Sequence, residues 1–204
     1  MRVIVMVMLT ILSVVLTGCV ALLIPSMSQV YHKDNVYVGA SIGYPAVTQV
    51  EANVWVSKQP DIDIGISGAR YSETSYSSIS FSPYVRYWIK SGDIPFLNVG
   101  GSLLIAIRTY DFREAFALGP SIFASIGYFG EVFSISLTAM SSVGYSEVFG
   151  RTSGYYLFGS LGLQMNLMPI RNIGMGLEIC PGLGIGSAAI LLPTLARLVL
   201  NFTF

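Results

Sequence analysis

The chain carries little charge, which argues against an ordinary soluble domain. Among its 204 residues 11 are basic and 11 acidic, so the formal net charge is zero and charged residues make up only 11% of the chain. Soluble domains contain about 25% charged residues, whereas here hydrophobic residues reach 53% and the mean hydropathy is +0.66. The zero net charge also removes the general electrostatic basis for binding nucleic acid.

Long apolar runs are missing beyond residue 25. A membrane-spanning helix needs about 20 apolar residues in succession, and the nearest candidate, GIGSAAILLPTLARLVLNFTF, is interrupted by Pro193 and Arg197. The chain is therefore too apolar for water, yet it has no spanning helix in this region. A transmembrane β-barrel resolves the conflict, because only every second residue of its strands faces lipid.

Histidine and cysteine are scarce, which argues against catalytic and metal sites. The single histidine, His32, precedes the predicted strands, so a Ser-His-acid site inside a barrel is excluded. The sequence has no Cys/His cluster of the kind that holds zinc. The acidic pair Asp61 and Asp63 follows Pro60 and is explained by turn chemistry. We expect no enzymatic activity, no metal and no cofactor.

The chain begins like a secretory signal. Arg2 precedes an apolar run, VIVMVMLTILSVV, which leads to the tetrapeptide LTGC ending at Cys19. This tetrapeptide and its placement resemble the lipobox of bacterial lipoproteins. The resemblance implies that residues 1–18 form a removable signal sequence and that Cys19 becomes a lipidated N-terminal residue.

Two alternatives stay open at this terminus. The stretch SMS at 26–28 offers a small-x-small site for ordinary signal cleavage before Gln29, and a retained apolar anchor requires no cleavage at all. Under lipidation, residues 19–34 are expected to form a periplasmic tether. Residues 35–204 then form the barrel.

Hydrophobicity alternates with a period of two through most of the chain. In residues 48–58, TQVEANVWVSK, the even positions are mainly apolar and the odd positions mainly polar, so the two sets lie on opposite faces of a strand. The same pattern predicts strands at 35–44, 48–58, 61–71, 78–90, 95–108, 117–128, 131–142, 154–167, 172–182 and 194–204. We therefore predict an all-β fold, a ten-stranded antiparallel up-and-down transmembrane β-barrel, with eight strands as the fallback.

The predicted connections alternate in length. Short ones are expected at 59–60, 91–94, 129–130 and 168–171, and longer ones at 45–47, 72–77, 109–116, 143–153 and 183–193. Outer-membrane barrels have short periplasmic turns and longer outer loops. This pattern predicts that both termini lie in the periplasm.

The chain ends on a bare aromatic residue. Leu198, Leu200, Phe202 and Phe204 stand at alternating positions. This ending resembles the C-terminal signal of bacterial outer-membrane barrels, which implies recognition by the barrel-insertion machinery. With its ten strands the chain also resembles the small monomeric barrels of Gram-negative-type bacteria, which implies a monomer embedded in the lipid bilayer of the outer membrane.

Charged residues are predicted to face the lumen. A barrel of ten strands has a lumen narrow enough for side chains to fill. The inward charges expected to form an ion-pair network are Glu51, Asp63, Arg86, Glu178 and Arg197. Mutual neutralisation of charges inside the barrel is the simple interpretation. A gated polar path is the alternative.

An apolar group is predicted to face the outer half of the lumen. Its members are Leu104, Phe123, Met140, Tyr156 and Phe158. They either fill the lumen or form a pocket for an acyl chain or another hydrophobic small molecule.

Two hypotheses about function follow. The first is a non-catalytic outer-membrane barrel that presents surface loops or binds a hydrophobic ligand in the upper lumen. The second is a narrow channel or transport component of the outer membrane.

Overall fold

The structure is a computed structural model of the 204-residue chain. It describes residues 21–24, 31, 36–44, 47–58, 60–73, 76–110, 113–130, 132–148, 152–170, 172–186, 190–193 and 196–204. The signal sequence 1–18 and Cys19 lie outside the described residues.

The described residues form one sheet of 13 strands. The strands are β1 (Ala21–Ile24), β2 (Val36–Tyr44), β3 (Val47–Lys58), β4 (Asp61–Glu73), β5 (Tyr76–Ser91), β6 (Ile94–Tyr110), β7 (Arg113–Phe129), β8 (Phe133–Val148), β9 (Thr152–Ile170), β10 (Ile173–Ile179), β11 (Gly182–Gly186), β12 (Ile190–Pro193) and β13 (Ala196–Thr203). Among these residues no helix is long and apolar enough to cross a membrane.

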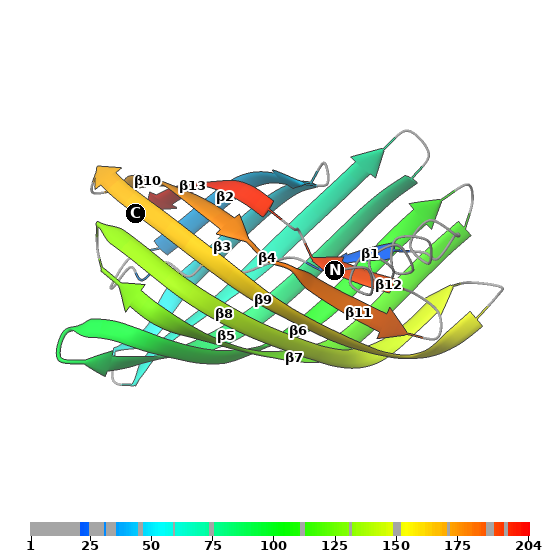
Figure 1. Ribbon diagram of the computed structural model, residues 1–204, viewed down its shortest axis with the longest axis horizontal. Helices are drawn as coiled ribbons and strands as arrows, with labels where there is room; N and C mark the ends of the chain where they lie inside the picture. Colours follow the sequence, from blue (N-terminus) through cyan, green and yellow to red (C-terminus); the bar gives the residue numbers. More distant parts are fainter. Residues whose placement is uncertain are drawn as a thin grey trace, which may run out of the picture.

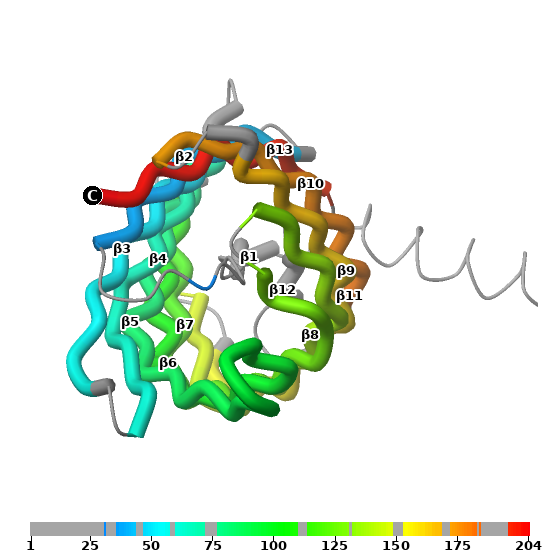
Figure 2. The backbone as a smooth tube through the Cα atoms, turned by 90° about the vertical axis from the view of Figure 1, so that its left-hand side faces the viewer, coloured from blue at the N-terminus to red at the C-terminus, as the bar shows by residue number. Residues whose placement is uncertain are grey.

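The sheet closes on itself. Strands β2 to β9 pair in succession as antiparallel neighbours, β9 pairs with β10, β10 with β13, and β13 with β2. Strands β10 and β11 are two parts of one strand that is interrupted at Cys180 and Pro181, and both pair with β9. With these two counted as one, the barrel has ten antiparallel strands, which confirms the predicted fold class (Figures 1 and 2).

The hairpins define the two ends of the barrel. We call the end with the hairpins β3–β4, β5–β6, β7–β8 and β9–β10 the turn end, and the opposite end, with the hairpins β2–β3, β4–β5, β6–β7, β8–β9 and β11–β12, the loop end. Phe204 lies at the turn end, where the backbone amides of Val36 and Phe204 each donate to the carbonyl oxygen of the other, at 3.0 and 2.9 Å. The last residue thus closes the ladder between β13 and β2.

The predicted long connections at the loop end are wrong. Glu73 pairs with Tyr76, and Val148 pairs with Thr152, so only two or three positions separate these strands. Strands β6 and β7 likewise pair as far as Tyr110 and Arg113. Backbone hydrogen bonds hold a ladder together whatever the polarity of its side chains, so the strands continue beyond the point where apolar alternation ends.

Two strands were not predicted. Strand β12 lies in the stretch 183–193 that was expected to be a loop, and it pairs antiparallel with β11. Strand β1 pairs with β12 in parallel, with Ala21 opposite Ile190 and Ile24 opposite Pro193. Strand β1 also comes close to four successive barrel strands, β4, β5, β6 and β7, as expected for a strand inside the barrel.

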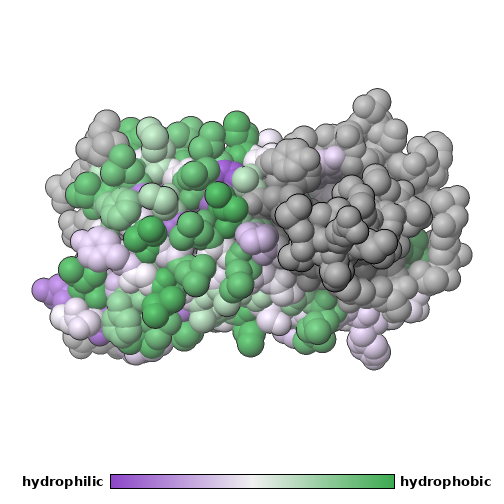
Figure 3. All heavy atoms as spheres, viewed as in Figure 1, coloured by the Kyte–Doolittle hydropathy of each residue, from purple (hydrophilic) through white to green (hydrophobic). Residues whose placement is uncertain are grey.

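Burial alternates along the strands as predicted. In β10 every second residue is buried, and in β8 Phe133, Leu137 and Tyr145 are exposed whereas Ser134 and Ser136 are buried. The exposed residues form an apolar belt that covers much of the turn-end half in Figure 3. The barrel is thus apolar outside and mostly polar inside, the reverse of a soluble barrel.

Aromatic residues lie toward both margins of this belt. Tyr87, Tyr128 and Phe204 are exposed near the turn end, and Phe81 and Tyr155 are exposed farther toward the loop end. Aromatic residues concentrate at the two interfaces of membrane proteins, where their rings sit at the level of the lipid headgroups.

Candidate functional site in the barrel lumen

The turn-end half of the lumen contains a buried ion pair. Asp63 and Arg86 are opposite each other on β4 and β5, so their side chains meet inside the barrel. The Arg86 guanidinium donates from Nε to Asp63 Oδ1 at 3.0 Å and from Nη2 to Oδ2 at 2.6 Å, and both side chains are fully buried. Trp88 Nε1 also donates to Asp63 Oδ2, at 3.2 Å. The carboxylate therefore accepts hydrogen bonds from three N–H groups, which partly offset its lost hydration.

Tyr84 extends this cluster across the lumen wall to β3. Its hydroxyl donates to Glu51 Oε1 at 2.7 Å and accepts from Asn53 Nδ2 at 2.8 Å. Gly65 lies between Tyr84 and Asn53 in the sheet, and a Cβ at this position would lie 2.6 Å from the Tyr84 hydroxyl. The missing side chain at Gly65 therefore allows the tyrosine to cross β4 and reach β3.

A second ion pair lies on the opposite wall. Glu178 and Arg197 face each other across β10 and β13, and Arg197 Nε donates to Glu178 Oε2. Arg197 Nη1 also lies 3.5 Å from the Ser41 hydroxyl. Both charged side chains are almost fully buried.

A chain of neutral polar side chains continues around this wall. Tyr37 donates to Asn201 Oδ1 at 2.8 Å, Asn201 Nδ2 donates to Asn166 Oδ1 at 3.2 Å, and Asn166 Nδ2 donates to Ser134 at 3.2 Å. These residues belong to β2, β13, β9 and β8, so the chain of bonds crosses several strands. Fully satisfied networks of this kind make an interior rigid.

The turn end itself is closed by aromatic rings. Trp88 packs edge-on against Phe129, with the ring centroids 5.0 Å apart, and the Arg86 guanidinium lies 4.5 Å from the Trp88 ring centroid. Trp88 and Phe129 are 2% and 1% exposed. Rings and ion pairs together fill the turn-end half of the lumen, in keeping with the small interior of a ten-stranded barrel.

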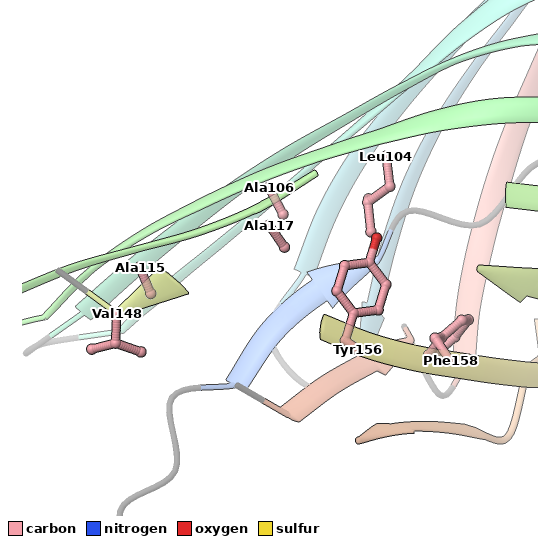
Figure 4. Close-up of a cluster of buried hydrophobic side chains, with 7 residues drawn as sticks. All are labelled: Leu104, Ala106, Ala115, Ala117, Val148, Tyr156 and Phe158. Carbon is pink, nitrogen blue, oxygen red and sulfur yellow. The ribbon is translucent and has the colours of Figure 1, made fainter. Parts of the chain in front are cut away.

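The loop-end half is apolar instead. Leu104, Tyr156 and Phe158 form one buried cluster with Val148 and three alanines of β6 and β7 (Figure 4). Ala106, Ala115 and Ala117 have small side chains, so this part of the wall projects little into the lumen. Tyr156 keeps a polar partner, because its hydroxyl lies 3.2 Å from that of Ser142.

The five residues predicted to form the apolar group divide between two clusters. Phe123 packs against Tyr84, with ring centroids 6.3 Å apart, rather than against Leu104, Tyr156 and Phe158. Met140 is half-buried and touches both clusters. The group is therefore a band along the lumen, and Phe123 marks its border with the charged half.

Four of the five predicted charged residues form two ion pairs, and the fifth, Glu51, forms a hydrogen bond with a tyrosine. Arg86 pairs with Asp63 and Arg197 with Glu178, while Glu51 accepts its hydrogen bond from Tyr84. Tyr84 and Trp88 were not among the residues predicted for the lumen site, so their bonds to carboxylates were missed. The signal in the sequence is an inward-facing glycine, Gly65, next to the inward-facing Tyr84 of the neighbouring strand, because the tyrosine ring can extend over a glycine.

Other predicted features give no site. Lipidation at Cys19 and the position of His32 concern residues outside the described part of the chain. Among the described residues no group of three His, Cys, Asp or Glu side chains can hold a metal ion. A groove of about 840 Å³ lies on the outer face, lined by apolar residues such as Ile42, Val50 and Leu198, and belongs to the apolar belt.

Comparison with known proteins identifies no family. Neither a protein-family model nor a curated protein matches the chain. Among solved structures the chain is similar to "KdgM porin in complex with disordered oligogalacturonate", with a TM-score of 0.32 and 8% sequence identity over 83% of this chain and 99% of that chain. The fold of the chain follows from its own strand pairing.

Proposed function

We propose that this chain is a non-catalytic barrel of the bacterial outer membrane that binds a hydrophobic ligand in the loop-end half of its lumen. The observation that carries the proposal is the division of the lumen: an apolar cluster around Leu104, Tyr156 and Phe158 adjoins a charged half that is filled by side chains. An apolar lumen that is closed at the turn end would suit an apolar molecule that enters and leaves at the loop end.

The membrane setting of the proposal is supported by the outer surface. Exposed apolar residues recur on every barrel strand, for example Ile42, Val85, Leu137 and Leu161. Exposed polar residues such as Arg70 and Ser153 appear toward the loop end. Leu198, Leu200 and Phe204 are more than half exposed, which leaves them accessible on the last strand for recognition by an insertion machinery. We place the turn end, with Phe204, in the periplasm.

Fatty-acid binding tests the ligand. Delipidated protein in detergent is expected to bind a fluorescent fatty acid, and Phe158→Ala is expected to weaken binding about tenfold, equivalent to about 1.4 kcal/mol, because the ring forms part of the apolar wall. Phe123→Ala should have a smaller effect, since Phe123 stands at the border of the band. Phe81→Ala, on the outer face, is the control. Affinity unchanged by both inner substitutions would contradict the proposal.

The second candidate is a narrow channel, and the observation that favours it is the charged lining of the turn-end half. A polar path past Glu51 and Arg86 would be selective for small ions. Dense packing argues against it, because Arg86 and Asp63 are fully buried and Trp88 is 2% exposed.

Planar-bilayer recording separates the two candidates. The wild-type protein is expected to give no steady conductance, because side chains fill the turn-end half of the lumen. A steady current whose ion selectivity changes in Glu51→Gln would establish the channel and reject the closed lumen.

A further inference from the structure

Tyr31 occupies an aromatic socket at the turn end. Its ring packs edge-on against Trp55 and Trp88, with centroid distances of 5.3 and 5.2 Å. Together with Phe129 these residues form a buried cluster, in which Tyr31 itself is only 9% exposed. The residue precedes the first barrel strand, so its burial is not a consequence of the strand ladder.

A charged residue also binds the ring. Lys90 Nζ lies 5.2 Å from the Tyr31 ring centroid and pairs with Asp61 Oδ2. A cation over an aromatic face adds an electrostatic attraction to the contact between rings. The socket thus holds Tyr31 by two aromatic neighbours, Trp55 and Trp88, and one cation, Lys90.

The same N-terminal segment makes a second contact at the other half of the lumen. Strand β1 pairs with β12 in parallel and comes close to β6 and β7. Its sequence, ALLI, is entirely apolar. In Figure 4 the ribbon of β1 passes beside the apolar cluster that contains Leu104 and Tyr156.

We propose that β1 and Tyr31 together form a displaceable intramolecular plug, with β1 docked on the apolar loop-end lumen and Tyr31 anchoring it at the turn end. A strand of four residues forms few hydrogen bonds and is weak by itself. Only six positions separate Ile24 from Tyr31, so seating the tyrosine keeps β1 at a high effective concentration near β12. Each contact therefore strengthens the other, and loss of the anchor releases the strand.

Cross-linking tests the coupling between the two contacts. Leu22 and Leu191 are direct partners in the β1–β12 pair, so Leu22→Cys with Leu191→Cys in a Cys180→Ser background is expected to form a disulfide in membranes. Adding Tyr31→Ala is expected to slow its formation about tenfold, the shift that corresponds to losing one or two aromatic contacts. Adding Tyr31→Phe keeps the ring and removes only the hydroxyl, so it should slow the reaction much less than Tyr31→Ala.

Matched controls exclude random collision. Leu22→Cys with Leu157→Cys, an outward position on β9, should not cross-link, and Leu191→Cys alone controls for pairing with Cys19. Heat-dependent gel migration establishes that each variant is a folded barrel.

Tryptophan emission reports on the socket itself. The chain has two tryptophans, and both pack against Tyr31. Acrylamide quenching is expected to rise in Tyr31→Ala and to stay at the wild-type level in Tyr31→Phe. The plug is overturned if Tyr31→Ala changes quenching but not the cross-linking rate, if the Leu22–Leu191 pair fails to cross-link, or if the mass of the mature protein corresponds to a start at Gln29, which removes β1. None of these readouts uses a ligand, so they test the plug separately from ligand binding.

Discussion

Replacing Arg86 by methionine is expected to destabilise the barrel by about 3–5 kcal/mol, because it leaves the Asp63 carboxylate buried without its cationic partner. Asp63 would retain the bond from Trp88 Nε1, which cannot compensate for a lost charge. Urea titration of the protein folded in lipid vesicles, followed by tryptophan emission, measures the change.

The double variant Arg86→Met with Asp63→Leu separates charge burial from packing. It should recover most of the loss, because replacing both partners of a buried pair by apolar residues is often nearly neutral. Arg70→Met is the matched control at an exposed position and should change stability by less than about 0.5 kcal/mol. A small effect of Arg86→Met alone would mean that water reaches Asp63 and that the lumen is not filled.

An arginine in the middle of the outer belt is expected to have the second-largest effect. Leu161 is 56% exposed and pairs with Ala139, and it lies on β9 midway between Tyr155 and Leu167. Leu161→Arg is expected to cost about 2–4 kcal/mol, the penalty for a cation at the midplane of a bilayer. Urea titration in vesicles gives the value.

The control for this substitution lies on the same strand and face. Ser153 is exposed near the loop end, so Ser153→Arg should cost at most about 1 kcal/mol, as expected for positions near the interface. Equal costs at the two positions would show that lipid does not cover the belt.

Strand faces were predictable from sequence because burial along most barrel strands alternates with a period of two. The inward residues of β5, from Ser78 to Trp88, were all assigned to the correct face. The cross-strand pair of Asp63 and Arg86 follows once a hairpin register is known, since residues directly opposite must meet. Register depends on turn geometry, which composition alone does not specify.

The ends of the strands were less predictable. Residues such as Ser72 and Ser77 pair although both are polar, so the loss of apolar alternation does not mark the end of a ladder. Strand β12 was missed for a related reason: its run of apolar residues lacks alternation and ends in Pro193.

Strand β1 and Tyr31 could not be predicted by the same method. The residues of β1 follow a signal-like apolar run with no alternation of their own. Contacts of Tyr31 depend on where the N-terminal segment enters the barrel, which is a tertiary property. Both belong to the stretch 19–34 that was expected to act as a tether.

Spin-label scanning along β5 tests the central claim most directly, namely that the outer face of a closed barrel lies in lipid. Nitroxides placed singly from 78 to 87 in vesicle-reconstituted protein should show collisions with oxygen that peak at Ile79, Phe81, Val85 and Tyr87, while a water-soluble nickel complex is excluded from the same positions. Equal access of the nickel complex to those outward positions, or a periodicity near 3.6 in place of 2, would contradict the account.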